Sequence, residues 1–150
     1  MSEHIYKSHN KTLLLYHLVF PAKYRRKVFS EGVEKTLKEI CLGMIVGYEI
    51  HFLEIGTDED HVHFLIQSVP TVSVTSMVTK IKSITAREIF RRNPEVKRML
   101  WGGNFWTSGY YANTVGQYGN EMVIRNYVKN QGKQYKQWHR DQLTLFEGLA

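Results

Sequence analysis

The run from His61 to Ser68 is apolar apart from two histidines and two polar residues at its end. Side chains of a β-strand point alternately to opposite sides, so His61 and His63 share one face while Val62 and Phe64 take the other. Two imidazoles on one face of a strand can reach one divalent ion. The pattern also fits two histidines on the solvent side of a half-buried strand. The run therefore predicts a strand, with a metal site or a solvated histidine pair as the alternatives.

A second segment, Tyr127 to Gln131, has the character of a helix. Residues four apart on a helix are neighbours, so Tyr127 and Gln131 share a face. A histidine pair that faces a tyrosine and an amide suggests metal-assisted phosphoryl transfer onto the tyrosine. The chain holds nine tyrosines, and a packing role for Tyr127 beside a solvated Gln131 is the alternative.

An acidic connection enters the histidine run and ends at Asp60. The carboxylate of Asp60 can ligate the ion, or accept a hydrogen bond from His61 and so orient its ring. The alternative is a solvated turn with no role in a site.

Apolar periodicity predicts alternating strands and helices along one domain, residues 1–150. The polar lead-in, 1–10, is expected to be loose. Strands are expected at 12–20, 48–55, 61–68 and 110–115, and helices from Ser30 to near Gly47, at 73–92, at 95–100, and from Gly119 or Asn120 to about Lys136. The order β-α-β-β-α-β-α is that of a split βαβ, ferredoxin-like α+β fold. We therefore expect an antiparallel sheet with helices on one face and an added C-terminal helix that carries Tyr127.

The chain is basic, with 20 Lys and Arg against 14 Asp and Glu and a net charge of +6. This balance suits a polyanionic partner such as nucleic acid. Lys80, Arg87 and Arg91 lie close to one line along a predicted helix, and Arg25 and Arg26 stand in a basic turn. Each set either follows phosphates or is an ordinary solvated surface.

Three aromatic residues lie in a glycine-containing stretch, namely Trp101, Phe105 and Trp106. They can stack on unpaired bases or pack in the protein core.

Cys41 is the single cysteine, which excludes an internal disulfide, and its place in an apolar pattern predicts a core residue. The N-terminus lacks the apolar core of a signal peptide, and no apolar run has the ~20 residues of a membrane span. No phosphate-binding glycine loop of the P-loop kind is present, so no nucleotide cofactor is expected. We expect a cytoplasmic protein that joins the nucleoid when bound to DNA.

Several stretches together resemble a known family, the HUH single-tyrosine transposases of small bacterial and archaeal insertion sequences, which move as single-stranded DNA. They are residues 56–66 with the His-Val-His motif, 109–116, and 124–131 with the Tyr-x-x-x-Gln motif. The basic turn Tyr24–Arg26, the length and the order of elements also look like the family.

The resemblance implies that His61 and His63 are the HUH histidines and that Gln131 is the third protein ligand of a Mg²⁺ or Mn²⁺ ion. It also implies that Tyr127 is the nucleophile and forms a 5′-phosphotyrosine with single-stranded DNA. The implied partners are DNA hairpins near the ends of the element and a second copy of the chain in a homodimer. Neutral histidine and amide ligands suit such an exchangeable ion better than structural zinc.

Two other functions stay open from the sequence. A domesticated relative that processes repetitive palindromic elements, or a rolling-circle type nickase, shares the chemistry but differs in DNA target. A ferredoxin-like sheet can also serve as a non-catalytic nucleic-acid binding module.

Overall fold

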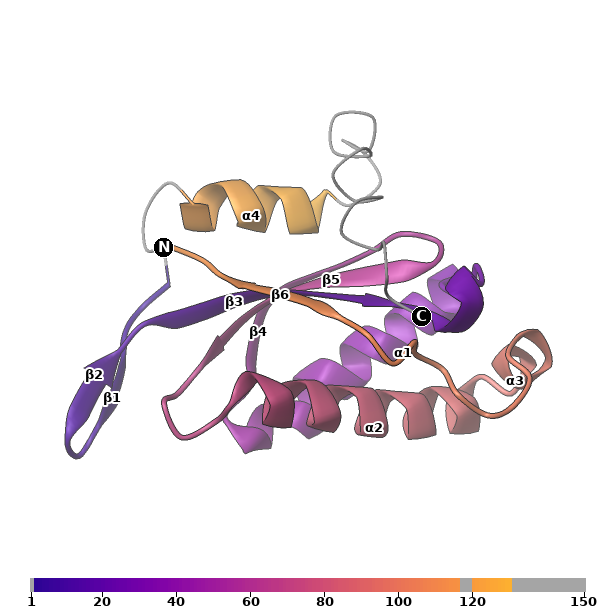
Figure 1. The fold of residues 1–150 in the computed structure, drawn as a ribbon, viewed down its shortest axis with the longest axis horizontal. Helices are drawn as coiled ribbons and strands as arrows, with labels where there is room; N and C mark the ends of the chain where they lie inside the picture. Colours follow the sequence, from indigo (N-terminus) through magenta and orange to yellow (C-terminus); the bar gives the residue numbers. More distant parts are fainter. Residues whose placement is uncertain (1, 117–119, 131–150) are drawn as a thin grey trace.

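The structure is a computed structural model that describes residues 2–116 and 120–130. Its centre is a four-stranded antiparallel sheet with the order β4-β5-β3-β6 (Figure 1). In chain order the sheet strands are β3 (Leu14–Pro21), β4 (His51–Thr57), β5 (His61–Ser68) and β6 (Tyr111–Thr114). The first and third of these lie at the centre, as in a split βαβ unit. The predicted ferredoxin-like α+β class is confirmed.

The remaining elements connect or cover these strands. A hairpin comprises β1 (Ile5–Lys7) and β2 (Asn10–Thr12). The α-helices are α1 (Glu31–Ile40), α2 (Val74–Arg92), α3 (Glu95–Met99) and α4 (Asn120–Lys129). Short non-α turns of helix follow β3 at Lys23–Arg25 and follow α1 at Cys41–Ile45 and Val46–Tyr48.

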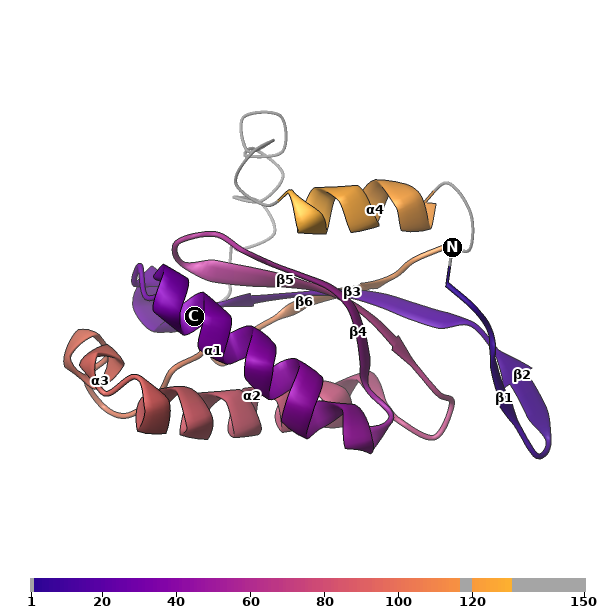
Figure 2. The ribbon, with the colours of Figure 1, turned by 180° about the vertical axis from the view of Figure 1, so that it is seen from behind.

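Two layers of helix enclose the sheet (Figures 1 and 2). Helices α1 and α2 cover one face, where Leu18, Phe20 and Phe64 join the main hydrophobic core. Helix α4 crosses the opposite face, over a smaller apolar cluster centred on Leu15 and Leu65. The alternation of each strand therefore sends one set of side chains to the main core and the other set toward α4.

Helices α1 and α2 begin where their capping residues predict. The Ser30 hydroxyl accepts a hydrogen bond from the backbone of Val33, and the Ser73 hydroxyl accepts one from the backbone of Ser76. Such caps satisfy amide groups that the first helical turn leaves unpaired. The first helical run ends at Tyr48, close to the expected end at Gly47, but only its first part is an α-helix, because π geometry begins at Cys41 and 3₁₀ geometry at Val46.

Three further expectations are tested by the described residues. The lead-in is not loose, because most of it forms the β1–β2 hairpin. Cys41 is buried, as predicted, and burial raises the pKa of its thiol. The predicted end of the last helix near Lys136 lies outside the described residues. None of the described helices is long and apolar enough to cross a membrane.

Candidate active site

The two histidines of β5 lie on the face of the sheet that α4 covers. Their ring centroids are 5.1 Å apart. His61 is 1% exposed and His63 is 0% exposed, which rules out the solvated pair as the description of this strand. Burial, followed by the nearby charges of His17 and His61, holds the pKa of His63 well below its usual value. His63 is therefore neutral near pH 7 and has a lone pair on one ring nitrogen.

Asp60 holds the ring of His61 from the preceding turn. Its Oδ1 lies 2.7 Å from His61 Nδ1, and its Oδ2 lies 3.0 Å from Arg25 Nε. Burial alone would raise the pKa of Asp60, but the hydrogen bond from His61 and the charges of His61 and Arg25 outweigh it and lower the pKa. An ionised Asp60 accepts a hydrogen bond from Nδ1–H of His61, so Nε2 is the ring nitrogen that could bind a metal. The geometry fits the orienting role predicted for Asp60.

The turn that supplies Arg25 has left-handed backbone at two successive non-glycine residues. Tyr24 has φ 58° and Arg25 has φ 54°. Each such residue costs roughly 1 kcal/mol or more. Backbone hydrogen bonds from Lys23 to Phe105 and from Arg25 to Ala22 hold the turn in this form. The strained turn directs the guanidinium of Arg25 to Asp60, so Arg25 belongs to the histidine site in this structure.

His17 of β3 is a member of the site that the sequence did not single out. Its Nε2 lies 2.9 Å from His63 Nδ1, and its side chain is buried. Burial lowers the pKa of His17 to about 4, against a smaller raising effect of Asn113. The alternation of β3 puts His17 on the same face as the histidines of β5. Knowing that these strands are neighbours would have revealed it.

Tyr127 enters the same cluster from α4. Its ring meets the ring of His63 edge-on, with centroids 5.0 Å apart, and lies 6.3 Å from the ring of His17. Tyr127 is 6% exposed. The tyrosine and the two histidines of β5 therefore meet within a single chain, although more than sixty residues separate them in sequence.

An ion pair joins α4 to the sheet, and hydrogen bonds join it to the segment at Ser2. Arg125 lies 3.5 Å from a carboxylate oxygen of Glu54 on β4 and 3.7 Å from one of Glu121. Glu121 is fully buried and accepts hydrogen bonds from the backbone and hydroxyl of Ser2. These contacts position the helix so that Tyr127 faces the histidines.

Gln131, the predicted third ligand, lies outside the described residues. Within residues 2–116 and 120–130, no group of three or more His, Cys, Asp or Glu side chains is placed to hold a metal ion. A divalent ion at His61 and His63 would need a ligand of another kind, such as an amide or a phosphate oxygen.

The predicted DNA contacts occupy different surroundings. Arg26, Lys80 and Arg87 are exposed, and the ammonium of Lys80 lies 4.5 Å from the ring centroid of Tyr48. Arg91 is also exposed but pairs with Glu88 at 2.8 Å. The exposure of Arg26, Lys80 and Arg87 fits a solvated surface as well as a phosphate-binding surface.

The aromatic stretch divides into core and surface residues. Phe105 and Trp106 are buried in the main core, and the Trp106 indole donates a hydrogen bond to Thr85. Trp101 is exposed. Phe105 and Trp106 therefore cannot stack on bases in this conformation, whereas Trp101 is accessible for stacking.

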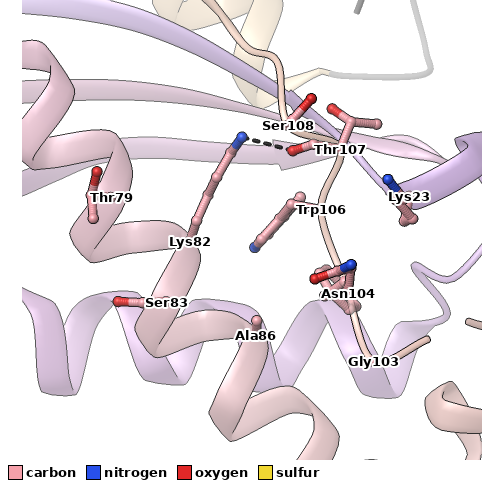
Figure 3. A pocket seen from close by; sticks show the side chains of 11 residues that line it. Lys23, Thr79, Lys82, Ser83, Ala86, Gly103, Asn104, Trp106, Thr107 and Ser108 are labelled. Atoms are coloured by element: carbon pink, nitrogen blue, oxygen red, sulfur yellow. Dashed lines mark hydrogen bonds between the residues drawn. The ribbon is translucent and has the colours of Figure 1, made fainter. Parts of the chain in front are cut away.

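A hollow of about 480 Å³ lies between α2 and the connection before β6 (Figure 3). Lys82 crosses it and donates to the backbone oxygens of Thr107 and Gly109. Burial lowers the pKa of Lys82. The hollow shares no lining residue with the histidine cluster, and Lys82 serves to tie the connection to α2.

Comparison with known proteins gives one family. The family model for IS200-like transposases matches residues 10–131. The ISDra2 transposase TnpA of Deinococcus radiodurans is 31% identical over 118 residues, which cover 79% of this chain and 84% of that protein. The transposase for insertion sequence element IS200 of Salmonella typhimurium is 29% identical over 124 residues, or 83% of this chain and 80% of that protein.

Solved structures share the architecture. A crystal structure described as a transposase from Deinococcus radiodurans R1 has a TM-score of 0.65 and 27% identity, and the match covers 85% of this chain and 97% of that chain. A REP-associated tyrosine transposase bound to a REP hairpin has a TM-score of 0.60, with coverage of 91% and 74%. At 12% identity the second structure shows the fold alone.

Proposed function

This chain belongs to the IS200-like transposase family, and we propose that it cuts and rejoins single-stranded DNA at the ends of an insertion sequence, with Tyr127 as the nucleophile and a divalent ion at His61 and His63. One observation carries the proposal: the ring of Tyr127 packs edge-on against His63, 5.0 Å between centroids, beside His61. A tyrosine and two histidines in one buried cluster are the groups that such chemistry requires.

The histidines suit Mg²⁺ or Mn²⁺. Asp60 holds Nδ1 of His61, and His17 is hydrogen bonded to Nδ1 of His63, so Nε2 is the nitrogen of each ring that would bind a metal. Gln131 and a phosphate oxygen of the DNA would be further ligands. When bound, the ion supplies Lewis-acid stabilisation to the scissile phosphate.

Tyr127 carries the covalent step. Its phenol oxygen bonds to the scissile phosphorus as the bond from phosphorus to the 3′ oxygen breaks. The phenol proton is lost, the 3′ oxygen gains a proton, and the products are a 5′-phosphotyrosine and a free 3′-hydroxyl. Attack by another 3′-hydroxyl reverses the step, so rejoining needs no ATP. A phenol with a pKa near 10 needs help to lose its proton at neutral pH.

The substrate we propose is a single strand that carries hairpins. The fold it shares with a transposase bound to a REP hairpin supports this class of DNA, as does the net charge of +6. Arg26, Lys80, Arg87 and Arg91 are the candidate phosphate contacts, with the pairing of Arg91 to Glu88 making it the weakest of them. Because one tyrosine holds one DNA end, excision with resealing needs two nucleophiles, and we propose a homodimer that acts on DNA in the cytoplasm.

The relatives favour the mobile-element form of this chemistry. Two that align over about four-fifths of the chain, at about 30% identity, are insertion-sequence transposases. The likeness to the REP-associated transposase is one of fold, so the domesticated role and the rolling-circle role have no specific support. The catalytic reading is preferred over a binding module because Tyr127 is buried against His63.

The test incubates the protein with single-stranded DNA that carries a hairpin from its element, with Mn²⁺. We expect a covalent protein–DNA adduct on denaturing gels that is absent from Tyr127→Phe while hairpin binding persists. Tyr111→Phe is the matched control, since Tyr111 also lies beside His17, with ring centroids 6.1 Å apart. An adduct formed equally well by Tyr127→Phe would remove Tyr127 from the mechanism.

A further inference from the structure

The contact between His17 and His63 is an in-plane hydrogen bond. Nε2 of His17 lies 2.9 Å from Nδ1 of His63, while the ring planes differ by 17° and the centroids are 5.1 Å apart. The centroid separation exceeds the nitrogen–nitrogen distance by about two ring radii. The rings therefore meet edge to edge and nearly coplanar, which is the geometry of a direct N–H···N bond and not of face-to-face stacking.

The sheet places this contact. His17 and Leu65 are directly opposite in the β3–β5 register, and His63 is opposite Val19. His17 and His63 are thus diagonal neighbours on the α4 face, within reach of ring side chains. Both side chains are buried, so the bond is shielded from exchange with water.

The neighbour on the other side of His17 decides which nitrogen carries the shared proton. Asn113 lies directly opposite His17 on β6. Its amide nitrogen donates to the backbone oxygen of Thr114, and its buried side-chain oxygen lacks a well-formed hydrogen bond among the described residues. An acceptor at this place favours a proton on Nδ1 of His17, and its effect on the pKa of His17 has the sign expected of an acceptor. A neutral His17 with a proton on Nδ1 has its lone pair on Nε2.

We propose that His17 is a positioning residue that accepts a hydrogen bond from Nδ1–H of His63 and so fixes the tautomer whose lone pair is on Nε2, the nitrogen that would bind a divalent ion. This inference rests on the metal site of the proposed function. It gives each histidine of β5 its own support, since Asp60 holds His61 from one end of the site and His17 holds His63 from the other. Partners of this kind fix ring orientation and typically change metal affinity 10–100-fold when removed.

Two variants separate the hydrogen bond from the packing. His17→Gln retains an amide oxygen able to reach the place of Nε2, whereas His17→Leu fills similar space and has no acceptor. The first readout needs neither metal nor DNA: long-range ¹H–¹⁵N spectra of metal-free protein report the tautomer of each histidine. We expect the Nδ1–H form of His63 in the parent and in His17→Gln, and a mixture of tautomers in His17→Leu. A parent His63 protonated on Nε2 would overturn the proposal.

The second readout is Mn²⁺ affinity by calorimetry. We expect a loss on the order of 10–100-fold in His17→Leu and a change of only a few-fold in His17→Gln. Equal Mn²⁺ affinity of parent and His17→Leu, with the same His63 tautomer, refutes the positioning role. A parent that binds no Mn²⁺ instead refutes the metal site of the proposed function, and the tautomer spectra then decide the role of His17 on their own. If His17→Leu does not fold, the tautomer spectra of the parent and of His17→Gln still test the role of His17.

Discussion

Acid should weaken the folded protein through His17, and the effect can be calculated. The pKa of His17 is about 4 in the folded chain, mainly because of burial, against about 6.5 for an unfolded histidine. The unfolded chain therefore takes up the proton first as the pH falls. The contribution of His17 to the free energy of unfolding is fully present above pH 6.5 and is lost between pH 6.5 and pH 4. Below pH 4 this residue causes no further loss.

The loss from pH 7 to pH 5 is about 2 kcal/mol for this pair of pKa values. With a urea dependence of roughly 2 kcal/mol per molar, the urea midpoint should move by about 1 M. In His17→Gln no group titrates at this position. The urea midpoint of this variant should therefore move by about 1 M less between pH 7 and pH 5 than the midpoint of the parent. His63 and the other histidines contribute to both proteins and largely cancel in the difference.

The assay is urea unfolding followed by tryptophan fluorescence at pH 7 and pH 5, with a chelator present so that bound metal does not contribute. His9→Gln is the matched control, because His9 is exposed in the turn of the β1–β2 hairpin. It should keep the pH dependence of the parent. If His17→Gln and the parent lose the same stability between pH 7 and pH 5, the reasoning about a buried, neutral His17 is refuted.

Three further predictions test other parts of the site. Asp60→Asn should lower Mn²⁺ affinity on the order of 10-fold, because the charged acceptor of His61 is lost; unchanged affinity in calorimetry would contradict the orienting role. Arg125→Gln should speed hydrogen exchange of the α4 amides, since its contacts to Glu54 and Glu121 are broken; exchange at the parent rate would show that these contacts do not hold the helix. Arg87→Ala should weaken hairpin binding and reduce the slope of log affinity against log salt by about 1, and an identical slope would exclude a phosphate contact.

The sheet and its histidine strand were predictable because their signals are local. Strict alternation sets the two faces of β5, and the observed strand begins at His61 and ends at Ser68 as expected. The caps Ser30 and Ser73 mark helix starts through bonds made within one turn. Where neighbours in sequence supply the determining contact, the sequence is enough.

Other features depend on partners far along the chain. His17 looks like one residue of a buried strand until β5 lies beside it, forty-six positions later. Likewise the lead-in forms a hairpin although its residues are mostly polar and exposed. The change from α to π geometry after Ile40 was missed because the apolar spacing of the first helix continues past this residue. Periodicity reports which face is apolar but not which hydrogen-bond ladder the backbone adopts.

The hydrogen bonds between Ser2 and Glu121 join residues 119 positions apart. During synthesis on the ribosome, every strand of the sheet leaves the exit tunnel before α4 does. A growing chain can pair β3 with β5 and assemble its histidine face while the tyrosine has yet to be made. The start of the chain must then wait for the helix that closes over that face. Under the proposed mechanism, a nascent transposase would have its place for a metal and DNA early, and would gain the means to cut only once α4 is made and docks on the sheet.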